Sequence, residues 1–230
     1  MKILGIIPAR GGSKGIPGKN IKLLGGKPLL AYTANAAAQA KLLNEIMISS
    51  DSKDIIEVAE KYQIKAPFIR PANLADDTTP TVDVIKHALN FYHVQKIYFD
   101  AVCVLQPTYP FREKGFIDAC IEKFISAGAD TLISVVPVPH QYNPHWVFEK
   151  NDDGYLISST NDKKIISRRQ DLPEAFIRDG SVYVIKTDTI INDKNIFAAK
   201  ITYQLSSPEW YVNIDTPDDW KLAEDKAEKY

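Results

Sequence analysis

The sequence predicts an α/β protein whose central sheet is mostly parallel and carries helices on both faces. Apolar runs without alternation are typical of strands that are buried on both faces, and they occur at residues 3–7, 45–50, 100–105 and 130–136. Segments with an apolar stripe at helical spacing lie between these runs, at residues 28–40, 52–62 and 113–126 and from Pro80 onward. Strands that alternate with helices indicate right-handed βαβ units and a parallel sheet.

The chain's composition limits the class of protein. Its 230 residues, 45% of them hydrophobic, suit one globular unit. The net charge of −1 indicates neither a nucleic-acid surface nor a polybasic membrane anchor. No apolar run approaches the roughly 20 residues of a membrane span, and the N-terminus lacks the features of a signal peptide. We therefore expect a cytoplasmic protein with no nucleic-acid or membrane partner, in which Cys103 and Cys120 are reduced core thiols.

Local signals set the expected element ends in the first half of the chain. Pro28 suits the first turn of a helix, and Asp51 is a candidate N-cap for the helix that follows it. Residues 66–69 are expected to form a short third strand that ends at Arg70. Thr79 is then the expected N-cap of a helix whose first residue is Pro80.

The character of the sequence changes at Pro137. Residues 137–179 contain Pro-Val-Pro, several aromatic residues and a turn at 151–154, without a long helical period, so they are expected to form an insertion of hairpins. Strands are expected at residues 181–185, 197–203 and 210–214. Thr216 and Pro217 then fit the N-cap and first position of a terminal helix. The predicted division is a core of residues 1–136 and 180–230 and an inserted arm of residues 137–179.

A glycine-rich loop follows the first strand, IPARGGSKGIPGKN at residues 7–20. Glycines allow a concave arrangement of backbone N–H groups that binds anions, and the side chains of Arg10, Lys14 and Lys19 can close over phosphates. The loop matches neither the P-loop, because Ser13 stands where a glycine is required, nor G-x-G-x-x-G. It is interpreted as a polyphosphate-binding loop at the carboxyl end of the first strand; a flexible surface loop is the alternative.

Three further polar side chains are expected at the same edge of the sheet. Arg70 and Gln106 follow predicted strands, and Asp215 joins them if the strand that it ends lies beside the first strand. A nucleoside triphosphate fits this set, since phosphoryl-type transfer needs in-line positioning and charge neutralisation. Asp215 is a candidate ligand for Mg²⁺, which takes few protein carboxylates. The alternative is an acid that only flanks the terminal helix.

The loop resembles the N-terminal signature of the acylneuraminate cytidylyltransferase family, the CMP-sialic acid synthetases. Further stretches resemble that family in the same order, and together they cover essentially the whole chain: residues 69–71, 74–78, 105–108, 168–171, 179–183 and 214–216. The resemblance implies a Rossmann-like fold of the nucleotide-diphospho-sugar transferase type with a small β-rich dimerisation arm. It also implies that CTP and an acidic nine-carbon sugar are converted into a CMP-sugar and pyrophosphate, with Mg²⁺ as cofactor.

The resemblance also implies roles for particular residues. Catalytic roles fall on Arg10, Lys19, Asp215 and Arg169, and the last of these completes the neighbouring subunit's site in a homodimer that exchanges arms. The metal site falls on Asp215 and Asn213. Nucleotide contacts fall on Arg10, Lys19, Ala9, Gly11, Gly12, Ser13, Asn20, Arg70, Thr79 and Thr81. Sugar contacts fall on Gln106, Asp179, Tyr183 and Phe197.

Four positions depart from the family's pattern. Asn213 replaces the first of two aspartates near the metal, which leaves one carboxylate there. On the sugar side, Asp179 replaces an asparagine, and Ile177 replaces an arginine that occurs here one position later, as Arg178. Relatives carry a pair of phenylalanines where this chain has Ile196 and Phe197. These sugar-side changes favour a nonulosonic acid other than N-acetylneuraminate, such as a legionaminic- or pseudaminic-type sugar.

Two alternative functions stay open at this point. One is a nucleotidyltransferase for another sugar, such as the eight-carbon acid Kdo, or a relative that uses GTP. The other is a nucleotide-binding module without turnover. The joint presence of Arg10, Lys19 and Asp215 argues against the binding module, because binding alone needs no metal carboxylate beside a triphosphate.

Overall fold

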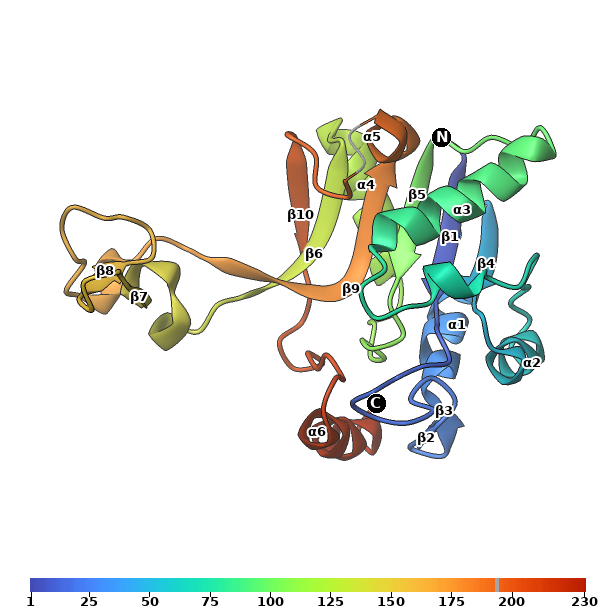
Figure 1. Ribbon diagram of the computed structural model, residues 1–230, viewed down its shortest axis with the longest axis horizontal. Helices are drawn as coiled ribbons and strands as arrows, with labels where there is room; N and C mark the ends of the chain where they lie inside the picture. Colours follow the sequence, from blue (N-terminus) through green and yellow to red (C-terminus); the bar gives the residue numbers. More distant parts are fainter. Residues whose placement is uncertain (193–194) are drawn as a thin grey trace.

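The computed structural model describes residues 1–192 and 195–230, and its centre is a twisted sheet (Figure 1). In the described residues this sheet has six strands in the order β10-β6-β9-β5-β1-β4. Their bounds are β1 Ile3–Pro8, β4 Glu45–Ser49, β5 Ala101–Leu105, β6 Thr131–Pro137, β9 Phe176–Lys186 and β10 Ile201–Leu205. Only β9, among these strands, runs antiparallel to its neighbours β5 and β6. The predicted, mostly parallel sheet is therefore confirmed.

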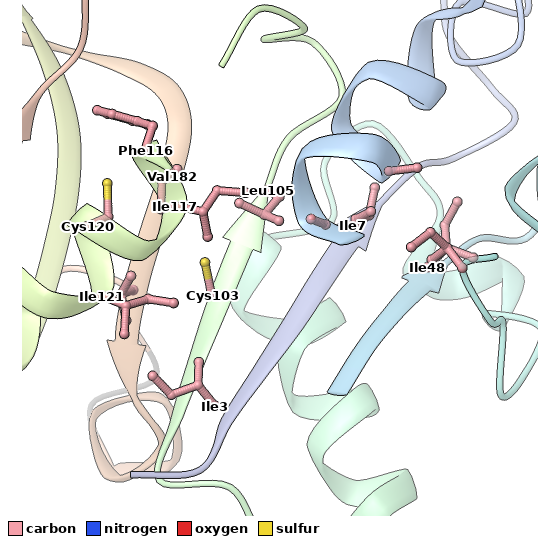
Figure 2. Close-up of a cluster of buried hydrophobic side chains, with 14 of the residues drawn as sticks. Ile3, Ile7, Ile48, Cys103, Leu105, Phe116, Ile117, Cys120, Ile121 and Val182 are labelled. Atoms are coloured by element: carbon pink, nitrogen blue, oxygen red, sulfur yellow. The ribbon is translucent and has the colours of Figure 1, made fainter. Parts of the chain in front are cut away.

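Helices cover both faces of the sheet, as predicted. One face carries α1 (Leu29–Gln39), α2 (Lys53–Lys61) and α4 (Phe116–Ala127). Figure 2 shows this packing, in which Ile117 and Cys120 of α4 lie near Cys103 of β5. Both cysteines are free and buried, and burial raises the pKa of the Cys103 thiol to about 12, so it stays protonated and unreactive.

The opposite face carries α3 (Thr81–Val94) and α5 (Thr187–Asn192). Ile85, Ala88 and Tyr92 of α3 are buried on this face, in one cluster with Val102 and Val104 of β5. The buried side chains of β5 thus contact helices on both faces. This explains why its sequence has no polar alternation.

A third apolar cluster lies beyond the carboxyl edge of the sheet. It joins α6 (Pro217–Ala227), a small ladder of β2 (Leu23–Leu24) with β3 (Lys27–Pro28), and the end of the glycine-rich loop. The predicted N-cap of α6 is confirmed, because Thr216 accepts a hydrogen bond from the Asp219 N–H group and Asp219 completes a capping box. A short 3-10 turn, η1 (Ala72–Leu74), lies near the same edge.

An extended segment leaves the core between β6 and β9 and forms the arm seen in Figure 1. Its described elements are the 3-10 turns η2 (His140–Tyr142), η3 (Pro144–Trp146) and η4 (Arg169–Asp171) and the antiparallel pair β7 (Phe148–Lys150) and β8 (Leu156–Ser158). The Trp146 indole N–H donates to the Ile166 carbonyl, 2.7 Å away. The arm therefore has contacts of its own, while residues 176–178 continue the central sheet beside β6.

Three of the predicted strands differ in the structure. Residues 66–69 form no strand; a single bridge pairs Met47 with Lys65, because Pro67 has no N–H group for a ladder. Residues 210–214 also form no strand. They run past the carboxyl edge of the sheet, where the Ile214 N–H donates to the Thr108 carbonyl of a loop. The strand expected at 197–203 lies at Ile201–Leu205.

Several predicted helix starts are wrong by a few residues. Ser52, not Asp51, caps α2 by accepting a hydrogen bond from the Ile55 N–H group. Pro28 and Pro80 are themselves the N-cap residues of α1 and α3, so Thr79 caps nothing. α4 starts at Phe116 because its N-cap Gly115 has a left-handed φ of 81°. None of the helices in the described residues combines the length and apolar character that crossing a lipid bilayer requires.

Candidate active site

A cavity of about 440 Å³, the first cavity, opens at the carboxyl ends of β1 and β5. Parallel strands of an open α/β sheet place their ligand sites at this edge. The cavity brings together ten of the site residues predicted from the sequence: Arg10, Ser13, Lys19, Asn20, Arg70, Thr79, Thr81, Gln106, Asn213 and Asp215.

Hydrogen bonds to residues at the edge of the sheet hold the glycine-rich loop in place. The Ala9 N–H donates to the Ser49 carbonyl, and the Gly11 N–H donates to Asp51 Oδ1 at 3.0 Å. The buried Asn20 side chain donates from Nδ2 to the Arg10 carbonyl at 3.0 Å. These bonds hold the two ends of the loop, while Ala9, Gly11 and Gly12 lie beside the first cavity without lining it.

The loop touches the segment that carries Asp215. A Cβ atom built on Gly15 would lie only 2.3 Å from the Asp215 carbonyl oxygen, so glycine is required for this close approach. Lys19, whose side chain is 12% exposed, donates from Nζ to the Ile214 carbonyl at 2.7 Å and to Asp215 Oδ1 at 3.1 Å. Asp215 therefore lies beside the glycine-rich loop although its segment is not a strand.

Asp215 is not needed to cap the helix that follows it. Thr216 and Asp219 already cap α6, and the Asp215 N–H itself donates to Asp219 Oδ2 at 3.0 Å. The Asp215 side chain is 62% exposed and contacts Asn213, whose Nδ2 donates to Asp215 Oδ2 at 2.8 Å. This leaves the Asn213 amide oxygen beside the carboxylate.

These oxygens fit Mg²⁺, which is commonly held by one or two carboxylates together with substrate phosphates and water. In the described residues no group of three or more His, Cys, Asp or Glu side chains could hold a metal ion. The donor set thus fits a metal that arrives with a phosphate ligand rather than one enclosed by protein alone.

Two cations of the loop share one carboxylate that the sequence did not single out. Arg10 Nη2 lies 2.5 Å from Asp77 Oδ1, and Lys14 pairs with the other oxygen. The hydrogen bond from Lys14 is the main cause of a lowered pKa of Asp77. Because all three residues line the first cavity, a bound polyphosphate would compete with Asp77 for Arg10 and Lys14.

Arg70 lies deeper in the same cavity and is 4% exposed. Its Nη2 is 3.6 Å from Asp51 Oδ1, and burial lowers the pKa of its guanidinium. Among the described residues, its Nε and Nη2 atoms have no hydrogen-bond partner. Buried donors of this kind are normally satisfied, so Arg70 is suited to meet the acceptor atoms of a ligand.

A second cavity of about 260 Å³ adjoins the first, and Thr81, Gln106 and Asn213 line both. Gly180, with a left-handed φ of 83°, lies at its wall. A Cβ atom at this position would lie 2.9 Å from Gln106 Oε1. The Gln106 amide therefore packs directly against the Gly180 backbone, at the junction of the two cavities.

The predicted sugar contacts lie in or near this second cavity. Asp179 and Tyr183 line it, and Phe197 contacts another lining residue, Arg178, whose guanidinium carbon is 5.6 Å from the phenyl ring centre. Arg169 lies in η4 of the arm and lines neither cavity.

Asp179 is bonded to the protein through both carboxylate oxygens. Oδ1 accepts from Ser134 Oγ at 2.5 Å and from the Ser181 N–H at 2.8 Å, and Oδ2 accepts from Ser206 Oγ. The residue is only 1% exposed. Both carboxylate oxygens therefore point to donors of the protein, and the hydroxyl and N–H dipoles offset part of the repulsion that this carboxylate would exert on an acidic ligand.

The sequence-based reasoning missed Arg112, which is buried and holds the junction of the two cavities in place. Its Nη2 donates to the Gln106 and Ser181 carbonyls, each at 2.8 Å, and its Nη1 donates to the Tyr109 carbonyl and Thr33 Oγ1. Burial lowers its pKa to about 10, which leaves it charged at neutral pH. The one signal in the sequence is an arginine directly after Pro110 and Phe111, in the loop that leaves the central strand β5.

Comparison with known proteins identifies the family. The family model described as "Cytidylyltransferase" matches residues 4–225, which is nearly the whole chain. The chain belongs to the cytidylyltransferase family.

Two curated relatives of the family illustrate the similarity. The CMP-N,N'-diacetyllegionaminic acid synthase of Legionella pneumophila is 35% identical over 227 residues, which are 97% of this chain and 95% of that protein. The pseudaminic acid cytidylyltransferase of Campylobacter jejuni is 34% identical over 223 residues, with the same two coverages. The resemblance stated from the sequence motifs is therefore confirmed, including the branch of the family.

A solved structure supports the fold independently. The structure of a CMP:2-keto-3-deoxy-manno-octonic acid synthetase complexed with CTP has a TM-score of 0.73, with 16% sequence identity and full coverage of both chains. At this identity the likeness shows the cytidylyltransferase fold and nothing about substrate.

Proposed function

We propose that this protein transfers the cytidylyl group of CTP to a nonulosonic acid. The observation that carries the proposal is the close contact of Gly15, in the glycine-rich loop, with the Asp215 backbone at the first cavity. A second cavity adjoins the first, and Gln106 lines both. The names of two relatives support this choice of reaction, because one is a CMP-N,N'-diacetyllegionaminic acid synthase and the other is a pseudaminic acid cytidylyltransferase.

In the proposed reaction the anomeric hydroxyl oxygen of the sugar forms a bond to the α-phosphorus of CTP. The bond from that phosphorus to the oxygen bridging to the β-phosphorus breaks, pyrophosphate leaves with the electron pair, and the hydroxyl proton passes to water. Arg10 and Lys19 neutralise charge on the triphosphate, which is most of what such a transfer requires of a protein. Gln106, at the wall common to both cavities, orients the sugar.

The remaining nucleotide contacts follow the shape of the first cavity. Arg70 offers buried donors to the cytosine, and Thr79 and Thr81 offer hydroxyl groups at the cavity wall. Ser13 and Asn20 also line this cavity and would contact the nucleotide. Ala9, Gly11 and Gly12 lie beside the cavity, and their backbone would set the position of the loop relative to the nucleotide.

We further propose Mg²⁺ as the cofactor, held by Asp215 and the amide oxygen of Asn213. When bound, the ion would neutralise phosphate oxygens during the transfer. We also keep the prediction that the protein acts in the cytoplasm, since the reaction consumes CTP.

A homodimer with exchanged arms is part of the proposal. The arm exposes large apolar side chains, such as Tyr155 (73% exposed) and Leu156 (71% exposed), which a second copy of the chain would cover. Arg169 of the arm would then complete the partner's site. A mixed dimer of Arg169→Ala and Arg10→Ala subunits should regain one working site, and failure to regain activity would reject the shared site.

The decisive experiment measures pyrophosphate release with CTP and Mg²⁺ against a panel of nonulosonic acids and Kdo, with GTP, UTP and ATP as controls. Release with CTP and one nonulosonic acid supports the proposal and names the sugar. Release with Kdo or GTP favours the related nucleotidyltransferases. Saturable CTP binding without release, for every sugar, favours the binding module.

A further inference from the structure

The second cavity has one cationic side chain among its described lining residues, Arg178. The other residues around it are neutral apart from Asp179, whose two oxygens are bonded to Ser134, Ser206 and the Ser181 N–H. The lining therefore carries one guanidinium and one carboxylate, and only the guanidinium has hydrogen-bonding capacity that is not already directed to the protein.

Arg178 also keeps its hydrogen-bonding capacity. Within the described residues it takes part in none of the ion pairs and donates no side-chain hydrogen bond; the arginine and lysine ion pairs there involve Arg10, Lys14, Lys19, Arg70, Arg168, Lys186 and Lys221. A guanidinium presents a planar fork of N–H donors that matches both oxygens of a carboxylate. Its donors are thus suited to an anionic ligand.

The position of the guanidinium is set by its neighbours. Its carbon lies 5.6 Å from the ring centre of Phe197, within cation–π range. Its backbone is fixed in β9, where Arg178 pairs with Val135 of β6. The Arg178 side chain is exposed, so this ring contact is what limits its motion, and a side chain limited in this way loses less entropy when it binds a ligand.

We propose that Arg178 binds the carboxylate of the acidic sugar and is a specificity-determining residue of the second cavity. This inference rests on the proposed function, since it assigns the charged group of the sugar that this function requires. It differs from the role given to Arg169, because Arg178 belongs to the same subunit as the cavity that it lines.

The test combines a side-chain change with a change in the ligand. We expect Arg178→Met to raise the KM for the sugar by about tenfold to hundredfold, as loss of a charge-assisted hydrogen bond predicts, with the KM for CTP unchanged. Arg178→Lys keeps the charge without the fork and should give an intermediate KM. The matched control is Lys186→Met, which removes one positive charge from the other end of β9, where Lys186 pairs with Asp130.

The ligand change is the methyl ester of the same sugar, which has no carboxylate charge. The wild-type protein and Arg178→Met should have the same KM for the ester, because the interaction that distinguishes them is absent. An equal loss on acid and ester would show that Arg178 contacts another group, and a loss confined to Arg169→Met on the acid would assign the carboxylate to the arm. Either result overturns the inference.

The experiments distinguish failure of the proposed function from failure of the inference about Arg178. If the wild-type protein releases no pyrophosphate with any nonulosonic acid, the proposed function fails and this inference fails with it. If the wild-type protein is active and Arg178→Met has the wild-type KM for the acid, only the inference fails.

Discussion

Replacing Gly15 by alanine tests whether contact between the glycine-rich loop and Asp215 is needed for activity. The added Cβ would lie 2.3 Å from the Asp215 carbonyl oxygen, whereas ordinary contacts start at 3.4 Å. The obstacle is backbone, which cannot rotate away as a side chain can. The loop and the segment of residues 213–216 must therefore separate by about 1 Å.

A displacement of this size has a large expected effect on the rate. Misplacement of reacting groups by about 1 Å costs on the order of 10²-fold, which corresponds to about 2.7 kcal/mol of transition-state stabilisation. The overpacked contact should also lower the free energy of unfolding by about 1–3 kcal/mol. Initial rates of pyrophosphate release give kcat/KM for CTP, and urea denaturation gives the stability.

Gly12→Ala is the matched comparison in the same loop, because a Cβ at Gly12 meets no described atom within 4 Å. We expect this variant to keep the wild-type stability and to lose less activity than Gly15→Ala. A folded Gly15→Ala protein with wild-type kcat/KM would refute the reasoning. Equal losses of stability in both variants would show that the loop, and not its contact with Asp215, is sensitive to a methyl group.

Three further changes test other parts of the site. Gly180→Ala should raise the KM for the sugar and leave the KM for CTP unchanged, because the added Cβ would lie 2.9 Å from Gln106 Oε1 and displace that amide. Equal changes in the KM values of both substrates would contradict this. Arg112→Met should lower the free energy of unfolding by about 2–5 kcal/mol, because each buried carbonyl left without its donor costs about 1–3 kcal/mol and the Gln106 and Ser181 carbonyls both lose theirs. A urea midpoint close to that of the wild type would contradict this expectation. Asp77→Asn should lower the KM for CTP by a factor of about 1.4 to 5, since exposed ion pairs contribute about 0.2–1 kcal/mol. A higher KM would mean that Asp77 orients Arg10 instead of competing for it.

Much of the core could be predicted because its signals are local. The apolar runs of β1, β4, β5 and β6 and the stripes of their helices each lie within a dozen residues. The direction of β9 could not be predicted, since a strand buried on both faces has the same residue pattern whether it runs parallel or antiparallel. Residues 210–214 show a related ambiguity, because Val212 and Ile214 are buried against α6 and not against a neighbouring strand.

Some features of the candidate site could also be predicted from the sequence, and others could not. The loop cations and Asp215 could be located because each follows an apolar run, and their positions at one edge of the sheet come from the α/β fold. The partners of these residues could not be predicted. Asp77 pairs with Arg10 across 67 positions of the chain, and Arg112 reaches Ser181 across 69. Such contacts depend on how the chain packs in three dimensions, and composition and residue spacing do not predict them.

The departures on the sugar side gain a common explanation from the geometry of β9. Successive side chains of a strand point to opposite faces, so an arginine at position 178 faces the other way from one at position 177. Both side chains are exposed; Ile177 pairs with Val136, and Arg178, on the other face of the strand, lines the second cavity. The strand then bends, because Ser134 alone stands opposite residues 179–182, and Asp179 turns inward to Ser134 and Ser206. The changes therefore act together: the shifted arginine supplies unbonded positively charged donors to the cavity, and the new aspartate, which also lines it, directs its oxygens to donors of the protein.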